Sequence, residues 1–149
     1  MLRRNKTAQR EYEITDRLEA GIVLSGAEVK SVKKRGINFD GAYVKLVGNE
    51  VLLINASVEA YGFASPEGYD PKRSRKLLLH KKEIERIRGK LAQAGNLTIV
   101  PLSSYIKKGF VKLEIGIGKG RKTWEIKKVE QGKVEKRRIE KEMKEYIKT

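Results

Sequence analysis

The chain has 149 residues, 39% of them hydrophobic, and this length favours one domain with an appended segment over two full domains. Thirty-four lysines and arginines against nineteen acidic residues give a formal net charge of +15, which indicates a polyanionic partner because such a charge repels itself in a compact state. The sequence has no cysteine, which excludes a disulfide framework and a cysteine-based zinc site, and no apolar stretch long enough to span a membrane. The basic N-terminus lacks the apolar run of a secretory signal, so a reducing cytoplasm is the expected location.

The N-terminal segment predicts an arm followed by strands. Residues 1–11 are polar and basic, and we expect them to form a flexible arm. Apolar residues then recur in short β-like runs over residues 12–24, with Gly21 between the runs. This pattern predicts two strands separated by a kink or bulge at the glycine.

Two segments carry the signals of helices. Ser25 and Glu28 have the spacing of a capping box, and Gly36 can end the following helix in a left-handed conformation. Residues 81–94 carry apolar side chains at helical spacing and are followed by Gly95, which predicts an amphipathic helix.

The other segments of the main body favour strands and one loop. Residues 42–61 predict a hairpin with its turn at residues 48–49, followed by a further strand. Residues 62–75 are rich in glycine, proline, serine and aspartate and predict a loop. Residues 96–118 predict two strands joined by a turn at residues 107–109. Short strands with helices outside the sheet indicate a mainly β fold, a small closed or partly closed antiparallel barrel, with an open α+β sheet as the alternative.

The composition changes after Gly118. Residues 119–149 hold twelve lysines and arginines and six glutamates, and their apolar residues form an imperfect helical stripe that Gly132 interrupts. A helix of this kind is marginal alone in water. We therefore expect a basic C-terminal tail that is largely disordered when free and helical on a polyanionic surface.

Little in the sequence favours catalysis. His80 is the one histidine, and no second histidine or cysteine accompanies it to build a metal site or a thiol pair. The glycine-rich segment at residues 116–122 lacks the spacing of a phosphate-binding P-loop. We expect no enzymatic activity, no cofactor and no bound metal.

The stretch DPKRSRKLLLH, residues 70–80, has two interpretations. Four cations lie within five positions ahead of three leucines: Lys72, Arg73, Arg75 and Lys76. In one interpretation they form a solvated basic loop that leads into a core strand. In the other, the leucines fix a rigid edge from which the cations and His80 reach phosphates and bases. The charge pattern alone leaves both open.

Four blocks of the chain stand out together: LEAGIVLSGAEVKSVKKRGINF, DPKRSRKLLLHKKEI, LTIVPLSSYIKKGFVKLEIGIGKGRK and the basic tail. In this order, over residues 5–122, they resemble the SmpB family of SsrA-binding proteins. The resemblance implies an antiparallel barrel of the oligonucleotide-binding (OB) type with flanking helices and a tail that is unstructured in solution. It further implies a monomeric protein that binds the tRNA-like domain of tmRNA one to one, near the elbow, and accompanies it to the vacant A site of stalled ribosomes. There the tail would read the empty mRNA channel at the decoding centre of the small subunit.

The resemblance also implies a set of RNA-contacting positions. Matched by position, they fall on Asn5, Glu19, Leu78, His80 and Lys112. Glu19 can accept a hydrogen bond from a base edge, and Lys112 can neutralise a phosphate. Leu78 and His80 can face an unstacked loop base. Glu28 also matches a family position, but its capping-box spacing favours a structural role.

In the tail, the resemblance implies contacts with the ribosomal decoding centre from Lys119, Arg121, Lys122, Trp124, Glu125, Lys127 and Lys128. Trp124 occupies the position of a ring that packs on ribosomal RNA in relatives, whereas Ile126 replaces a cation. A tryptophan found further along the tail of some relatives has no counterpart. The Trp124 ring either stacks on a ribosomal base or folds back as a lid over the open end of the barrel.

Two other functions stay open at the level of the sequence. A general single-stranded RNA-binding barrel or RNA chaperone would bind with little shape selectivity and a steep salt dependence. A peripheral membrane protein would use the tail as an amphipathic helix. The narrow apolar face of the tail, with a glycine at its centre, makes membrane contact the least favoured of these, and we expect none.

Overall fold

In the computed structural model, the described residues are 3–62, 67–122, 124–128 and 130. Their strands and helices are, in chain order, β1 (Arg3–Arg4), α1 (Lys6–Glu11), β2 (Tyr12–Ile22), α2 (Gly26–Arg35), β3 (Tyr43–Val47), β4 (Glu50–Ile54), β5 (Arg75–Leu78), α3 (Lys81–Gln93), β6 (Leu97–Lys107) and β7 (Phe110–Gly120). Residues 124–128 are also helical. No helix in these described ranges is both long and apolar enough to cross a membrane.

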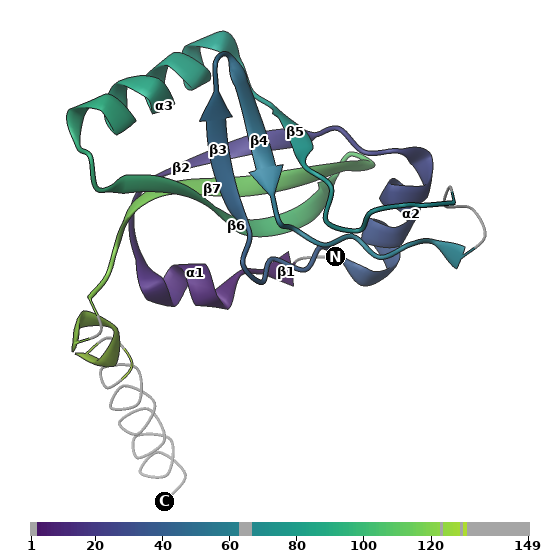
Figure 1. Cartoon of the computed structure of the whole chain (residues 1–149), viewed down its shortest axis with the longest axis horizontal. Coiled ribbons are helices and arrows are strands. Elements are labelled where there is room, and N and C mark those ends of the chain that lie inside the picture. The colour runs from purple at the N-terminus through teal and green to yellow at the C-terminus, as the bar shows by residue number, and fades with distance from the viewer. Residues whose placement is uncertain (1–2, 63–66, 123, 129, 131–149) are drawn as a thin grey trace, which may run out of the picture.

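Six of these strands close into an antiparallel barrel. The strand order is β6-β3-β4-β5-β2-β7, and β7 pairs again with β6 to complete the ring, while β1 pairs with β6 at residues 103–104, beyond the contact of β6 with β3. Figure 1 shows α1 and α3 on opposite sides of the barrel and α2 beside one end of it. The predicted mainly β barrel is confirmed, and the open-sheet alternative is wrong because the ring closes.

Apolar side chains that alternate along the strands fill the barrel. Leu53, Leu113 and Ile115 are at most 1% exposed and belong to one cluster, to which α2 adds Val32 and α3 adds Ile87. Burial of a side chain of this size contributes about 1.5–3 kcal/mol relative to leaving it in water. The cluster therefore fixes the register of the strands that carry the outward-facing residues.

The two predicted helices form as their signals indicate. The Ser25 hydroxyl accepts a hydrogen bond from the backbone N–H of Glu28 at 3.2 Å, and the Glu28 carboxylate accepts one from the Ser25 N–H at 3.0 Å. Helix α2 ends at Gly36, whose φ of 77° lies in the left-handed region. Helix α3 covers Lys81–Gln93 and buries Ile87 completely.

Residues 3–11 form a strand and a helix, where the sequence predicted a flexible arm. Arg3 and Arg4 pair with β6, and α1 follows directly. Ala8 on α1 is 4% exposed and packs with Val100 and Leu102 in a second, smaller cluster. A single apolar residue thus anchors a polar helix, which composition alone does not reveal.

Strand β2 runs without a break through Gly21, and its bulge lies elsewhere. The register of β2 against β7 shifts between Ile14 and Asp16, so the extra residue is Thr15. The bulge turns Ile14 outward, where it packs against α1, while Leu18 further along β2 faces the barrel interior. The expected pair of strands is therefore one bent strand.

Strand β6 has a matching bulge between Pro101 and Ser103. Glycines on β7 make room for the side chains that these bulges turn outward. A Cβ on Gly116 would lie 2.8 Å from Cδ1 of Leu102, and one on Gly118 would lie 2.6 Å from the carbonyl oxygen of Glu13. The glycine-rich end of β7 is thus explained by close packing under α1.

The further strand expected before residue 61 is absent from the described residues. After β4 the chain makes only an isolated bridge between Ser57 and Asn38. The third strand of this part is β5, which begins at Arg75, at the end of the predicted loop, and pairs with both β4 and β2.

Candidate nucleic-acid interface

One row of residues crosses four strands on the outside of the barrel. Gly21 on β2 pairs with Leu78 on β5 and with Lys112 on β7, and Lys112 pairs in turn with Tyr105 on β6. Leu78 is 52% exposed. Since neighbouring strands lie about 4.8 Å apart, Leu78 and Lys112 stand about 10 Å apart, one on each side of Gly21.

Glu19 lies two residues before Gly21, on the same side of β2. Its carboxylate accepts a hydrogen bond from the Tyr105 hydroxyl and lies 3.4 Å from Nζ of Lys107. The Tyr105 hydrogen bond, followed by the charges of Lys107 and Lys112, lowers the pKa of Glu19, so the carboxylate stays ionised and accepting. Burial and this hydrogen bond raise the pKa of Tyr105. We call the surface formed by these side chains the outer face: Glu19, Leu78, Tyr105, Lys107 and Lys112.

Gly21 makes the position of Leu78 possible. A Cβ added at Gly21 would lie 3.2 Å from Cβ of Leu78 and 3.5 Å from its Cδ1. The leucine therefore lies over the bare backbone of β2 and presents its apolar surface to solvent between charged neighbours.

Sequence reasoning missed the aromatic residues of this region. Tyr105 was part of a predicted strand but not of the predicted site, and Phe110, which is 69% exposed, lies on the same side of β7 as Lys112. The strand period of two and the tight turn at residues 108–109 place Tyr105 opposite Lys112. That register could have been counted from the sequence.

A polar hollow of about 320 Å³ adjoins the outer face. It is lined by Arg4, Gln9, Arg17, Ser103, Tyr105 and Glu114. Within it, Arg17 and Glu114 form an ion pair of 2.7 Å across β2 and β7. Tyr105 belongs to both surfaces, so the hollow continues the outer face toward the N-terminal segment.

The cationic stretch before β5 divides into exposed and buried members. Lys72 and Lys76 are exposed, and His80 is exposed at the start of α3, where its backbone N–H donates to the Glu83 carboxylate at 3.0 Å. Arg75, in contrast, is 0% exposed. Its expected contact with RNA is therefore wrong for this chain, because the guanidinium lies inside the protein.

Arg75 is the centre of a buried polar cluster with Glu28. It pairs with the Glu28 carboxylate at 2.7 Å and donates to the carbonyls of Ala56 and Pro71 at 2.9 and 3.0 Å. Arg73 binds the same carboxylate from the other side. Burial alone raises the pKa of Glu28, but hydrogen bonds from Arg73, the Ser25 backbone and Arg75 outweigh it and lower the pKa to about 2.

This cluster explains why both interpretations of the cationic stretch are partly right. Arg73 and Arg75 hold the loop before β5 against α2, whereas Lys72 and Lys76 stay in solvent. The structural role expected for Glu28 is confirmed, since its carboxylate serves both the helix cap and the two arginines.

Both side-chain polar atoms of Asn5 are hydrogen-bonded to backbone groups of the protein. Its Nδ2 donates to the carbonyl oxygen of Pro101 at 2.9 Å, and its Oδ1 accepts from the backbone N–H of Ala8 at 3.2 Å, which caps α1. The residue is 9% exposed. The structure thus places Asn5 largely buried and apart from the outer face, where it caps α1.

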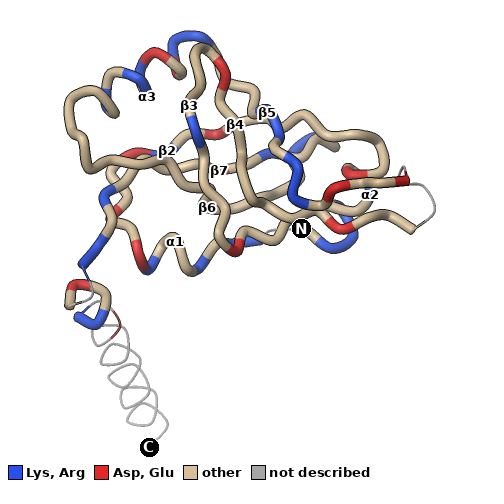
Figure 2. Tube along the Cα trace, viewed as in Figure 1, with Lys and Arg blue, Asp and Glu red and all other residues tan. Residues whose placement is uncertain are grey.

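The basic segment that follows β7 leaves the barrel beside the end of α1. The backbone N–H of Arg121 donates to the carbonyl of Glu11 at 2.7 Å. Figure 2 shows this segment leading from β7 into the helical turn at residues 124–128. Trp124 is 63% exposed, so the lid alternative is wrong for this structure.

The remaining expected tail residues are also accessible. Lys119, Lys122, Lys127 and Lys128 are exposed, and Arg121 and Glu125 are half-buried. The expectations of a tail that is disordered when free and helical on the ribosome concern residues 119–149, and 123, 129 and 131–149 of these lie outside the described residues.

A closed antiparallel barrel with exposed cations, an exposed leucine and aromatic side chains on one face defines a basic barrel protein of the nucleic-acid-binding class. The chain belongs to the SmpB family: the family model described as SmpB protein matches residues 2–145. The match covers the barrel, its helices and most of the tail.

Relatives and a solved structure agree with this assignment. The chain is 39% identical over 142 residues to an SsrA-binding protein of Chlamydia caviae, covering 95% of this chain and 94% of that protein. It is 44% identical over 144 residues to an SsrA-binding protein of a Sulfurihydrogenibium species, covering 97% and 94% of the two chains. It also resembles, with a TM-score of 0.67 and 39% identity over 82% of this chain and 85% of the other, a chain from a solved structure described as "tmRNA-SmpB: a journey to the center of the bacterial ribosome".

Proposed function

We propose that this protein binds the tRNA-like domain of tmRNA and brings it to stalled ribosomes for trans-translation. The proposal is supported by relatives that are SsrA-binding proteins and by the similar structure of SmpB with tmRNA and the bacterial ribosome. The observation that carries it is the strand register that gathers Glu19, Leu78 and Lys112 on one face. The protein acts in the cytoplasm as a monomer bound to one tmRNA, without catalysis, cofactor or metal.

The outer face suits an RNA loop whose bases are unstacked. Leu78 offers an apolar surface for the plane of a base, and Lys107 and Lys112 neutralise the neighbouring phosphates. Glu19 stays ionised next to these cations, so it is available as an acceptor for a donor on a base edge. Phosphate contacts hold the RNA in place, and the base contacts supply the selectivity.

The exposed residues near the chain's C-terminal side serve a second contact. Trp124 stacks on a base of the ribosomal decoding centre, and Lys119, Lys122, Lys127 and Lys128 hold the ribosomal backbone close to it. Base–aromatic stacking contributes about 1–3 kcal/mol per base. The tail then reads whether the mRNA channel beyond the decoding centre is empty.

A competition experiment tests the proposed function. Labelled tRNA-like domain of tmRNA is bound to the protein and displaced by an equal mass of unstructured RNA at several salt concentrations. We expect the protein to bind the tRNA-like domain more tightly than the unstructured RNA, and this difference in affinity should persist in moderate salt. Shape-dependent contacts are screened less than bare charge attraction. Equal affinity for both RNAs would instead identify a general single-stranded RNA-binding barrel.

A further inference from the structure

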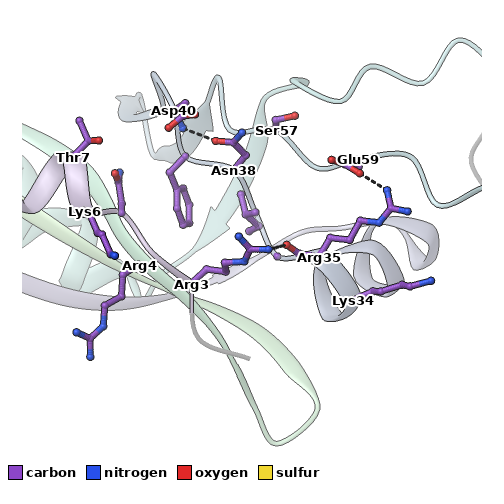
Figure 3. A pocket seen from close by; sticks show the side chains of 14 residues that line it. Arg3, Arg4, Lys6, Thr7, Lys34, Arg35, Asn38, Asp40, Ser57 and Glu59 are labelled. Atoms are coloured by element: carbon purple, nitrogen blue, oxygen red, sulfur yellow. Dashed lines mark hydrogen bonds and ion pairs between the residues drawn. The ribbon is translucent and has the colours of Figure 1, made fainter.

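A second polar cavity, of about 720 Å³, is lined by residues of β1, the start of α1 and the C-terminal end of α2. It opens between the N-terminal segment and the C-terminal end of α2, and residues 36–40 form its inner wall. Figure 3 shows Arg3 reaching across it toward Arg35, while Arg4 points away from Arg3 to the other side. We call this cavity the α2 groove.

The charge of the α2 groove is strongly positive. Five cations line it, Arg3, Arg4, Lys6, Lys34 and Arg35, against two carboxylates, Asp40 and Glu59. All seven are exposed. A groove with this balance attracts anions, and its open shape admits a chain of them.

Part of this charge has a structural explanation. Arg3 donates to the backbone carbonyl of Arg35 at the negative end of the α2 dipole, and Arg35 pairs with Glu59. Arg4, Lys6 and Lys34 have no such explanation: none of them has an ion-pair partner among the described residues. Three cations without ion-pair partners around one groove can contact successive phosphates of a nucleic-acid backbone.

The α2 groove and the polar hollow beside the outer face share one lining residue, Arg4. Tyr105 in that hollow belongs to the outer face. The route from Lys112 to Lys34 therefore passes Tyr105, Arg17 and Arg4 with cations along its length. An RNA strand that leaves the outer face on this side meets Arg4 first and then the groove.

Gly36 keeps the groove open in its present shape. A Cβ at Gly36 would lie 2.5 Å from Cγ and 2.6 Å from Nε of Arg3. With glycine at this position, Arg3 lies across the end of α2 and forms one wall of the groove, and a Cβ there would displace the Arg3 side chain. The glycine that ends the helix therefore also shapes the surface beside it.

We propose that the α2 groove binds a second stretch of sugar–phosphate backbone of the same RNA that lies on the outer face. Lys6 and Lys34 contact its phosphates at the groove, Arg4 contacts them on the side of the polar hollow, and Arg3 forms the wall. This inference rests on the proposed function, because it assigns the groove to the tRNA-like RNA rather than to another partner.

The test compares charge reversals in the full chain. Lys34→Glu alters the groove, and Lys45→Glu on β3 makes the same charge change at an exposed position that lines neither the groove nor the hollow. Affinity for the isolated tRNA-like domain is measured across salt concentrations. We expect Lys34→Glu to weaken binding about tenfold and to reduce the salt slope by about 1, and Lys45→Glu to do neither. Unchanged thermal unfolding shows that both variants are folded.

The outcomes separate the two proposals. If wild-type protein selects the tRNA-like domain but Lys34→Glu binds it no worse than Lys45→Glu, the groove assignment is overturned and the proposed function stands. The groove assignment is likewise overturned if Lys34→Glu weakens only the binding of ribosomes. If wild-type protein does not select the tRNA-like domain, the proposed function is overturned and the groove assignment with it.

A glycine pair gives an independent test of the groove's shape. Gly36→Ala places a Cβ against Arg3, whereas Gly41→Ala introduces a side chain at a similar positive φ, 73° against 77°, where nothing lies within 4 Å. Gly36→Ala should therefore weaken RNA binding at least several-fold more than Gly41→Ala does, measured at a temperature at which both are folded. Equal affinities for the two variants contradict the proposed groove.

Discussion

The carboxylate of Glu28 and the guanidinium of Arg75 lie 2.7 Å apart, with side chains 1% and 0% exposed. The pair joins α2 to the first residue of β5, and β5 carries Lys76 and Leu78 to the surface. A buried ion pair holds the fold only while both partners are present, because either charge left alone in the interior is costly. The position of the outer face's leucine therefore depends on residues that never reach the surface.

Glu28→Gln should destabilise the protein by about 3–5 kcal/mol, because it removes the charge that compensates the buried Arg75. Glu50→Gln is the matched control, since Glu50 pairs with Lys76 at 3.8 Å in solvent and its loss should cost at most about 1 kcal/mol. Urea unfolding followed by circular dichroism measures both. Similar unfolding midpoints for the two variants contradict a structural role for the buried pair.

The same pair should give the wild-type protein a distinctive acid dependence. The pKa of Glu28 is lowered to about 2 in the folded protein, against 4.5 as its ordinary value, so the folded state binds the Glu28 proton less readily than the unfolded chain. The stabilisation, about 3 kcal/mol from this shift, is fully present above pH 4.5 and is lost as the pH falls toward 2. Unfolding free energies of wild type and Glu28→Gln should differ most above about pH 5 and converge toward pH 2. A difference that stays constant over this range contradicts the assignment.

Leu78→Ala should weaken binding of the tRNA-like domain by about tenfold, since burying a leucine side chain contributes about 1.5–3 kcal/mol and part of this is lost with alanine. Val47→Ala is the control, because Val47 is also exposed, at 47% against 52%, and lies on β3 away from the outer face. Because both side chains are already about half exposed, truncating either one removes little buried contact. Both variants should therefore keep the wild-type unfolding midpoint. Equal affinities of the two variants for the tRNA-like domain would contradict a contact between the RNA and Leu78.

Trp124 should report the tail directly, because it is the only tryptophan of the chain. In free protein its fluorescence should be that of an indole in water, readily quenched by acrylamide, and it should change when ribosomes are added. Emission that is blue-shifted and protected from quencher before ribosomes are added contradicts the exposed ring seen here.

Truncation after Lys122 should separate the body from the tail. The cut leaves β7 intact to Gly120 and keeps the hydrogen bond from Arg121 to Glu11. We expect the truncated protein to bind the tRNA-like domain with near wild-type affinity but to support no peptide tagging on stalled ribosomes. Tagging by the truncated protein would show that the tail is dispensable.

Local signals predicted those elements whose cause is local. Ser25 and Glu28 cap α2 through bonds between residues three apart, and the turn between β6 and β7 needs only its glycine and its neighbours. The outward position of Leu78 also follows from strand alternation. Such features could be read from the sequence because a few adjacent residues determine them.

Features set by distant contacts could not be read in this way. The bulge at Thr15 depends on the register against β7, and the order of the N-terminal segment depends on Ala8 meeting Val100 and Leu102. In the sequence, Arg75 cannot be told apart from the other cations of its run. It is buried because its guanidinium pairs with Glu28 of α2 and binds the loop before β5. The resemblance to a family supplied Asn5 and the charge pattern supplied Arg75, but neither revealed that these two side chains are buried in this chain.

Strand β7 joins two surfaces that have different partners in the proposed function. Lys112 lies near its beginning on the outer face, and Gly120 at its end leads directly into the basic segment with Trp124. The eight residue steps between them span at most about 26 Å of strand, held on both sides by β2 and β6. The strand thus acts as a rigid spacer of defined length. An RNA seated on the outer face fixes, through β7, the point in the ribosome from which the tail starts.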